Sequence, residues 1–385
     1  MSKYGNSDRD DPVPEERGSR FRLPVIAWLS VLFFAACTKM SPEDGVARHD
    51  GTLVRLTVSL PQPALPTKGA RAGSLSGDAE NRIEDVMILV LEQENGKYVY
   101  RYMTEGERLE STGSGTQFQA KLLSTSKPVK LMLAGNYGDA FAAYAPSPSH
   151  SEAEVKAGIG CSFTGAAQSL PMYGEIAVPS GLEADRENRF SVKMLRAVAR
   201  IDVEKDLTAD SRPLRIESVR LYRPNDKIQL APDESFAPES PQVTAPSVFA
   251  GAVKSQSPVV TETSEPDPVS IAGIYVPEAD GVADAAARLT EATCIVVGGY
   301  YDGQSQPTYY RVDFDPGLEG HPFGQILRNY KYVFRIRKVT GPGWSDPGLA
   351  AVNKATSIVA EIEPWEDFTT EMHFEGDNYI GLSSR

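Results

Sequence analysis

The sequence predicts an all-β protein that folds into β-sandwiches behind an N-terminal export signal. Many short segments alternate apolar and polar residues, the pattern of half-buried strands. Turn residues separate them throughout, and the chain holds 32 glycines and 28 prolines, too many for long helices. Only 139–144 and 151–157 have a weakly helical pattern. Short strands with few helices are typical of sandwiches.

The N-terminal 37 residues have the order of a bacterial lipoprotein signal. Two basic residues, Arg20 and Arg22, precede an apolar run over 23–34, and two alanines then lead into Cys37. A cysteine directly after small residues at the end of a secretory signal is a lipobox. We therefore expect residues 1–36 to be a signal peptide and Cys37 to carry the lipid. The alternative, a membrane span, needs about 20 apolar residues, and this run is shorter.

The mature chain is long and acidic. Residues 1–37 carry five basic and five acidic side chains, so the mature chain keeps the net charge of −13. Nucleic acid requires a positive surface, so it is not an expected partner. A chain of this length exceeds what one core supports, which predicts two domains. The cysteines besides Cys37 are Cys161 and Cys294, which lie in apolar contexts. A disulfide between them is one alternative, but we expect each to be buried in a different core, and two cysteines are no disulfide framework.

The first half begins with the clearest strand pattern. In 53–60, Val54, Leu56, Val58 and Leu60 alternate with polar residues, which predicts that these four face a core. A loop over 61–82 follows; it is rich in small residues and contains Lys68, Arg71 and Arg82. Further strands are predicted at 86–91, which is apolar throughout and so buried on both faces, and at 98–103, 117–122 and 128–133.

The second half repeats this texture. Strands are predicted at 189–205, 214–222, 293–300, 307–314, 326–339, 355–363 and 367–375. Residues 225–292, rich in Pro, Ser, Asp and Ala, are expected to be a long excursion outside the core. The two strand-rich halves meet near 188–200, and we place the domain boundary between residues 192 and 193.

No motif for catalysis or metal binding stands out, so we expect no enzyme, no cofactor and no metal. The four histidines, His49, His150, His321 and His373, are scattered, and no zinc, phosphate-loop or serine-hydrolase spacing occurs. Two weak alternatives are a metal site at His373 with Glu371 and Glu375, and a carboxylate pair at Glu366 and Asp367. Six tyrosines either line a sugar-binding cleft or form cross-strand pairs that stabilise sheets: Tyr300, Tyr301, Tyr309, Tyr310, Tyr330 and Tyr332.

Several segments together resemble a known family. The block from Ile326 to Gly343 contains Leu-Arg-Asn-Tyr-Lys-Tyr and Thr-Gly-Pro-Gly, and 360–365 reads Ala-Glu-Ile-Glu-Pro-Trp. Residues 170–175 and 194–201 are further matching segments. These motifs are similar to those of the fimbrillins of Bacteroidales, the FimA-like fimbrial subunit lipoproteins of type V pili. Tyr330 departs from the family, which usually has His there.

The resemblance implies a fold and a route to the cell surface. Fimbrillins have two tandem transthyretin-like β-sandwiches and reach the outer membrane as lipoproteins. A surface protease specific for Arg or Lys then cuts the loop after the first strand. In this chain the cut would fall between Arg71 and Ala72, and residues 37–71 would be the tether, first strand and removable propeptide. The remainder would comprise an N-terminal domain over 72–192 and a C-terminal domain over 193–385.

The resemblance also implies polymerisation into a fimbrium without catalysis or cofactor. A sheet that loses an edge strand exposes unpaired backbone groups and an apolar slot, which a strand from another copy or a related subunit can fill. We expect the donor near the C-terminus, at Tyr379, Ile380 and Leu382. Alternatives are an uncleaved anchor, a tip or adhesin subunit and, from another class, a surface glycan-binding lipoprotein.

Overall fold

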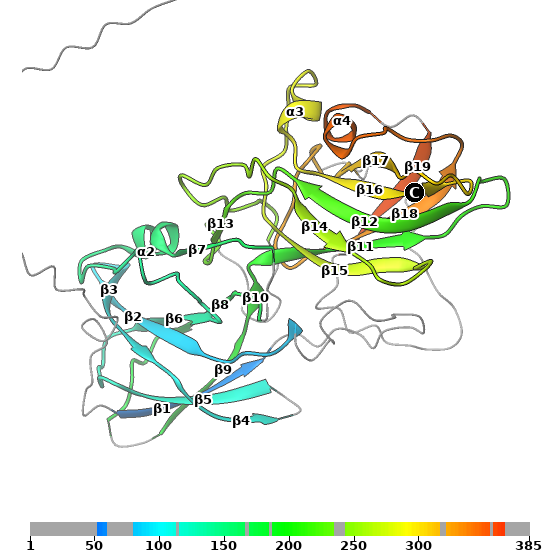
Figure 1. The fold of residues 1–385 in the computed structure, drawn as a ribbon. Coiled ribbons are helices and arrows are strands. Elements are labelled where there is room, and N and C mark those ends of the chain that lie inside the picture. The colour runs from blue at the N-terminus through cyan, green and yellow to red at the C-terminus, as the bar shows by residue number, and fades with distance from the viewer. Residues whose placement is uncertain are drawn as a thin grey trace, which may run out of the picture. The chain divides into compact units, whose positions relative to one another are not determined.

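The computed structural model describes residues 52–59, 80–112, 115–165, 169–184, 187–234, 243–315, 321–354 and 357–365. Strands dominate this part of the chain, and its helices are short: α2 (Glu152–Gly158), α3 (Arg288–Glu291) and α4 (Pro347–Val352) (Figure 1). The predicted all-β fold is therefore confirmed.

Strands from the first half of the chain form two sheets. One sheet has the order β4-β5-β1-β9, and the other has the order β10-β8-β6-β2-β3. In Figure 1, the blue strand β1 and the cyan strands β5 and β4 lie side by side. The strands are β1 (Thr52–Ser59), β2 (Val86–Glu94), β3 (Lys97–Glu105), β4 (Glu107–Thr112), β5 (Gly115–Leu122), β6 (Val129–Gly135), β8 (Met172–Val178), β9 (Asn188–Lys193) and β10 (Leu195–Arg196).

Strands from the second half form two more sheets, with the orders β15-β11-β18-β19 and β14-β12-β16-β17. A short pair, β7 with β13, joins the halves by backbone pairing. The strands are β7 (Gly160–Ser162), β11 (Val198–Lys205), β12 (Leu214–Tyr222), β13 (Lys227–Gln229), β14 (Val259–Glu262), β15 (Ser270–Pro277), β16 (Cys294–Tyr301), β17 (Thr308–Asp313), β18 (Lys331–Val339) and β19 (Ile358–Trp365).

The two halves repeat one pattern of pairing. The first strand of each half, β1 or β11, is antiparallel to one neighbour and parallel to the other. The second sheets correspond as well, because β3-β2-β6-β8 has the same order as β14-β12-β16-β17. Part of the predicted core is confirmed. All of 86–91 in β2 is buried, as its continuous apolar run indicates.

Local sequence signals explain some elements and mislead about others. Helix α2 begins at a capping box, in which the hydroxyl of Ser151 accepts from the Glu154 amide while the Glu154 carboxylate accepts from the Ser151 amide. The predicted helix over 139–144 is wrong, since these residues form turns. Residues 225–292 are not simply an excursion, because they contain β13, β14 and β15 and bury Ile274 and Val276.

Candidate assembly groove at strand β1

Strand β1 lies in the interior of its sheet. It pairs antiparallel with β5, from Thr52 opposite Leu122 to Val58 opposite Thr116. On its other side it pairs in parallel with β9, from Val54 opposite Asn188 to Ser59 opposite Lys193. The expectation that an edge strand would be lost therefore needs correction, because both sides of β1 carry ladder hydrogen bonds.

The inward face of β1 is fully buried where its side chains are described. Val54 and Leu56 are each 0% exposed, and Leu56 lies opposite Phe118 of β5, which is equally buried. Burial of two such side chains contributes about 3–6 kcal/mol, at roughly 1.5–3 kcal/mol each. The side chains of Val58 and Leu60 lie outside the described residues. Absence of β1 would thus leave an apolar slot between two strands whose backbone groups face each other unpaired.

The outward face of β1 makes one ion pair. The Nε of Arg55 lies 2.8 Å from Oε1 of Glu187, just before β9, and both side chains are partly exposed. Exposed pairs of this kind contribute little, about 0–1 kcal/mol. The strand is therefore held mainly by its buried face and its two ladders of backbone bonds.

Glu80 and Asn81, the first described residues after β1, make several polar contacts. The Glu80 carboxylate, 5% exposed, accepts from Nη1 of Arg200 at 2.7 Å and from the hydroxyl of Tyr275 at 2.5 Å. Arg196 donates from Nε to the Glu80 carbonyl and from Nη2 to Asn81. Burial lowers the pKa of the Arg196 guanidinium to about 10. These contacts hold Glu80 and Asn81 in place independently of β1.

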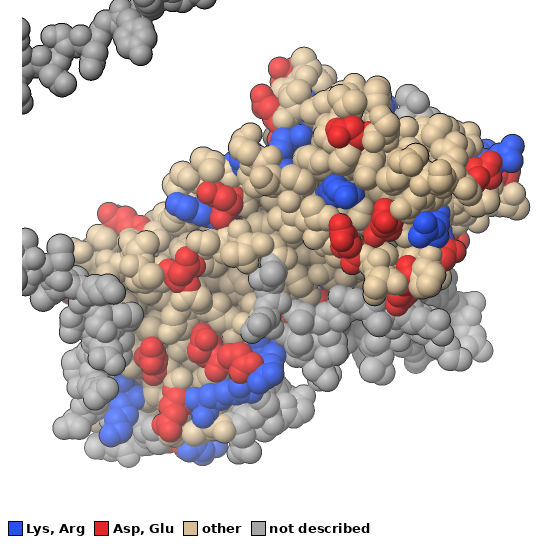
Figure 2. All heavy atoms as spheres, viewed as in Figure 1, with Lys and Arg blue, Asp and Glu red and all other residues tan. Residues whose placement is uncertain are grey.

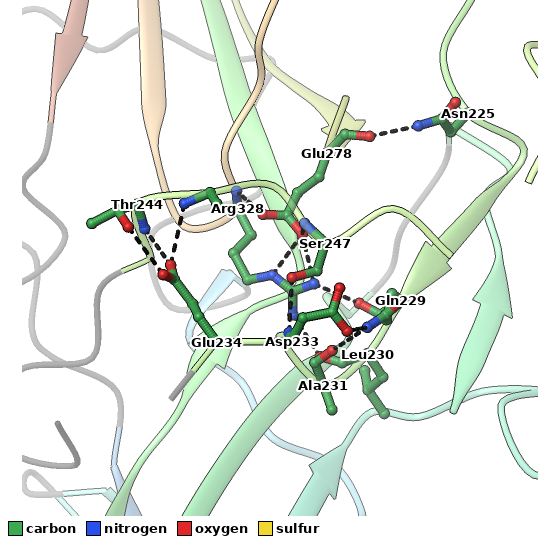
Figure 3. A network of polar contacts seen from close by, with 11 residues as sticks. Asn225, Gln229, Leu230, Ala231, Asp233, Glu234, Thr244, Ser247, Glu278 and Arg328 are labelled. Carbon is green, nitrogen blue, oxygen red and sulfur yellow. Dashed lines mark hydrogen bonds and ion pairs between the residues drawn. The ribbon is translucent and has the colours of Figure 1, made fainter. Parts of the chain in front are cut away.

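A second buried network surrounds Arg328, which is 0% exposed (Figure 3). Its Nε and Nη2 donate to Oε2 of Glu278 at 2.8 and 2.6 Å. Nη1 and Nη2 donate to the carbonyls of Leu230 and Gln229, and Glu278 also accepts from the Ser247 amide. A buried Arg needs such a fully bonded site. The network fastens the 225–292 segment to the residues that precede β18.

Asn329, which follows Arg328 in the Leu-Arg-Asn-Tyr-Lys-Tyr block, also has a structural role. Asn329 has a φ of 60°, a left-handed conformation that Asn adopts more easily than most residues. Its amide donates to the Val198 carbonyl, and its side-chain oxygen accepts from Nη1 of Arg196 at 3.1 Å. This turn means that the predicted strand 326–339 begins late, so that β18 starts only at Lys331. The Arg-Asn motif thus has a structural role.

Comparisons with known proteins address the fold. No family model and no curated protein matches the sequence. Among solved structures, a candidate cell adhesion protein from Parabacteroides distasonis superposes with a TM-score of 0.54 at 13% identity, over 81% of this chain and 98% of that chain. The chain has the fold of that protein.

Two fimbrial proteins superpose less well. The tip fimbrial protein Mfa3 from Porphyromonas gingivalis, with a C-terminal truncation, gives a TM-score of 0.45 at 13% identity, over 82% of this chain and 99% of that chain. A fimbrial assembly protein from Parabacteroides distasonis gives 0.45 at 13% identity, over 81% and 94%. Cell adhesion candidates and fimbrial proteins are thus among the solved structures that superpose on this chain, and the assignment of the fold rests on the first of them.

The site residues predicted from the sequence all lie outside the described residues: Cys37, Arg71, Ala72, Tyr379, Ile380 and Leu382. The alternatives at His373 and at Glu366–Asp367 lie outside them too. Sequence reasoning missed Glu80 and the partners β5 and β9. Arg196 and Arg200 belong to the 194–201 motif, which was the available signal, but the sequence assigned them no role.

The tyrosines do not gather on one surface. Tyr310 of β17 and Tyr332 of β18 lie in different sheets, and both are buried. Tyr300 and Tyr309 stack against Arg215 and Arg220. These contacts favour the cross-strand, stabilising interpretation over a shared sugar platform.

Other functional classes find no support in the described part of the chain. No cluster of three or more His, Cys, Asp or Glu residues is placed there to hold a metal. None of the helices described is both long and apolar enough to cross a bilayer. Cys161 and Cys294 are buried free thiols. On the face shown in Figure 2, Lys and Arg are interspersed with Asp and Glu, so the described residues form no basic patch there.

Proposed function

We propose that this protein is a structural subunit of a cell-surface fimbria. It is exported to the outer membrane as a lipoprotein through Cys37, cut after Arg71 by a surface protease specific for Arg or Lys, and polymerised by strand addition. Its partners are other copies of itself or related fimbrial subunits, and its final location is the fimbrium. This role needs no catalytic residue, cofactor or metal.

The interior position of β1 is the observation that carries the proposal. An interior strand leaves two ladders of unpaired backbone groups when it is lost, on β5 and on β9. A donated strand restores both ladders and refills the space of Val54 and Leu56. An edge strand would restore only one ladder, so exchange at β1 gives a stronger junction between subunits than the sequence alone led us to expect.

The remaining chain is suited to survive the cut. The contacts of Glu80 and Asn81 with Arg196, Arg200 and Tyr275 lie beyond the cut and do not involve β1. The repeated sheet topology supports two tandem domains, and we propose the boundary between residues 192 and 193. The proposed donor at Tyr379–Leu382 and the groove at β1 are different segments of the chain. Such a contact is heterologous and extends into an open filament.

The decisive experiment removes Lys68 and Arg71 from the loop. The double variant Lys68→Ala, Arg71→Ala should accumulate as a lipidated monomer and form no ladder on unboiled gels. The matched control is Arg82→Ala, at an exposed Arg that ends the loop and pairs with Glu84. It should polymerise like the unaltered chain. Ladders from the double variant would overturn cleavage at these two residues.

The N-terminus on intact cells distinguishes the subunit from an anchor. A polymerising subunit should begin at Ala72, whereas an uncleaved anchor or a monomeric lipoprotein should begin at lipidated Cys37. Replacement of Cys37 by Ser should abolish incorporation of labelled fatty acid and leave the precursor unprocessed. Labelled fatty acid in that variant would contradict lipidation at Cys37.

A further inference from the structure

A cavity of about 830 Å³ opens in the second half, away from the assembly groove. Five stretches of chain line it: the end of β12 and the residues after it, the segment before β14, the residues after β15, and helices α3 and α4. The lining residues that bear on ligand binding are Tyr222, Arg223, Lys254, Asp280, Asp284 and Glu291. Concave sites with a few convergent polar groups are where proteins bind small molecules.

Arg223, which lines the cavity, has an unfavourable backbone conformation. Its φ is 55°, in the left-handed region that a non-glycine residue rarely adopts. Its Nε donates to the Ala292 carbonyl, and its Nη2 donates to the carbonyls of Leu289 and Ala351. Its Nη2 also donates to Sγ of Cys294 at 3.1 Å, and the charge of Asp313 acts on the guanidinium without a direct ion pair. Within the described residues, Nη1 makes no hydrogen bond. The guanidinium is thus fixed in place and keeps donors for a ligand.

Lys254 adds a second cation beside it. Its Nζ donates to Oγ1 of Thr293 at 3.0 Å, and that hydroxyl donates to the Arg223 carbonyl at 2.8 Å. Among the described residues Lys254 forms no ion pair. Burial lowers the pKa of Lys254 to about 8, an effect that the charge of Asp280 opposes and that of Arg223 strengthens. An ammonium desolvated in this way gains from an anion that enters the cavity.

The rest of the lining has the opposite character. Asp280, Asp284 and Glu291 are exposed carboxylates, and Thr290 adds an exposed hydroxyl. Carboxylates accept hydrogen bonds from hydroxyl groups but repel a ligand of uniform negative charge. Tyr222, which is half-buried, supplies an aromatic ring. The lining therefore matches a small molecule with one anionic group and several hydroxyls.

We infer that this cavity binds an acidic sugar, with the sugar carboxylate at Lys254 and Arg223 and its hydroxyls at Asp280, Asp284 and Glu291. The volume is ample for one sugar ring. This inference goes beyond the proposed assembly role, because none of these residues belongs to the sheet that contains β1.

Two ligands that differ in one group test the inference. Glucuronate and glucose differ only in the carboxylate at C6, and acetate supplies a carboxylate without hydroxyls. In calorimetric titrations of the purified chain, glucuronate should bind at millimolar concentration, about tenfold or more tighter than glucose or acetate, as expected for one charge-assisted contact. Equal binding of glucuronate and glucose, or no binding of glucuronate, would overturn the inference. Acetate that binds as well as glucuronate would reduce the cavity to a simple anion site and overturn it too.

Variants assign the effect to Lys254. Lys254→Met should weaken glucuronate binding about tenfold and leave glucose unaffected, whereas Lys254→Arg, which keeps the charge, should retain most of the preference. Lys121→Met, at an exposed position on β5, is the matched control and should behave like the unaltered chain. Thermal unfolding of each variant separates loss of binding from loss of fold. A folded Lys254→Met variant with unchanged glucuronate affinity would contradict the inference.

Discussion

Strands β1 and β11 occupy equivalent places in their sheets but differ in their connections to the next strand. Both are antiparallel to one neighbour and parallel to the other. Between β1 and β2 lie residues 60–85, a connection of 26 residues, whereas between β11 and β12 lie only residues 206–213, a connection of 8. The long connection carries Lys68 and Arg71 in a context of small residues, where proteolysis concentrates.

The short connection is fixed to the neighbouring strand β18. The amides of Asp206, Thr208 and Arg212 donate to the carbonyls of Ile336, Arg337 and Val339. In addition, β11 follows β10 after a single residue, so that a cut behind β11 would leave it joined to the sheet of β10. One cut can therefore release β1 but not β11.

The parallel neighbours of the two strands differ as well. Strand β18 pairs on its far side with β19, whereas β9 stands at the edge of the described sheet and pairs there only with β1. Loss of β1 would leave its parallel neighbour β9 without a partner in that sheet while β5 stays paired with β4. Loss of β11 would leave its antiparallel neighbour β15 unpaired while β18 stays paired with β19. The strand beside the edge of the sheet is thus flanked by a parallel edge strand in the first half and by an antiparallel one in the second.

The largest expected effect comes from removal of β1. A chain that begins at residue 72 should lose at least the roughly 3–6 kcal/mol that burial of Val54 and Leu56 contributes, and so should unfold at a lower temperature. A synthetic peptide of Thr52–Ser59 should bind and raise the unfolding temperature, because binding to the folded state stabilises it. Differential scanning calorimetry measures both effects.

The control peptide carries Ser in place of Val54 and Leu56, which keeps the backbone donors and removes the apolar face. It should stabilise the shortened chain far less. If both peptides raise the unfolding temperature equally, the buried face of β1 is not what holds a strand in the groove.

The next largest effect should come from Arg328, which fastens the second half where β18 begins. Arg328→Met leaves the buried carboxylate of Glu278 without its partner and should cost about 3–5 kcal/mol in denaturant unfolding. The double variant Arg328→Met, Glu278→Gln should be more stable than the single one, because the buried charge is gone. Arg212→Met, at an exposed Arg 3.9 Å from Asp302, should stay within about 0.5 kcal/mol of the unaltered chain. A similar loss at both arginines would contradict a special role for Arg328.

The sequence predicted local patterns well and long-range neighbours poorly. The alternation of Val54 and Leu56 predicted the buried face of β1, and the weakly helical pattern over 151–157 predicted α2. That β1 is interior could not be predicted, because its partners β5 and β9 lie far along the chain. Arg328 resembled an ordinary surface Arg, since burial depends on Glu278, 50 residues away. The cavity at Lys254 was hidden for the same reason, because its lining comes from separate stretches.

A loop transfer tests whether length and basic residues alone make a connection cleavable. Insertion of the 18 residues 61–78 lengthens the 206–213 connection to 26 residues, the length of the natural long connection. Loop-closure entropy should reduce stability by only about 1 kcal/mol. An Arg-specific protease should cut the insert, yet the two fragments should stay together in size-exclusion chromatography, because β11, still joined to β10 in one fragment, pairs with β15 and β18 of the other. An insert of equal length without Lys or Arg is the control and should stay uncut. Separation of the fragments under native conditions would contradict the difference drawn between β11 and β1.

The smallest expected effect concerns the ion pairs that link β11 to β18. Among its described side chains, β1 makes one comparable contact, the partly exposed pair of Arg55 with Glu187. Burial raises the pKa of Asp202, but the hydrogen bonds and charges of Arg200 and Lys331 outweigh it, so the net pKa lies below the usual 3.8. A carboxyl whose pKa is lower in the folded state contributes its stability fully above pH 3.8 and loses it as the pH falls further.

The variant Asp202→Asn should therefore be less stable at neutral pH. Its stability should also fall less steeply below about pH 4, as measured by acid unfolding followed by circular dichroism. Asp267→Asn, at an exposed carboxylate that pairs with Lys205 at the end of β11, is the matched control and should leave the acid limb unchanged. If the Asp202→Asn variant and the unaltered chain lose stability equally below about pH 4, the charges on β11 add no stability beyond that of its short connection, which is hydrogen-bonded to β18.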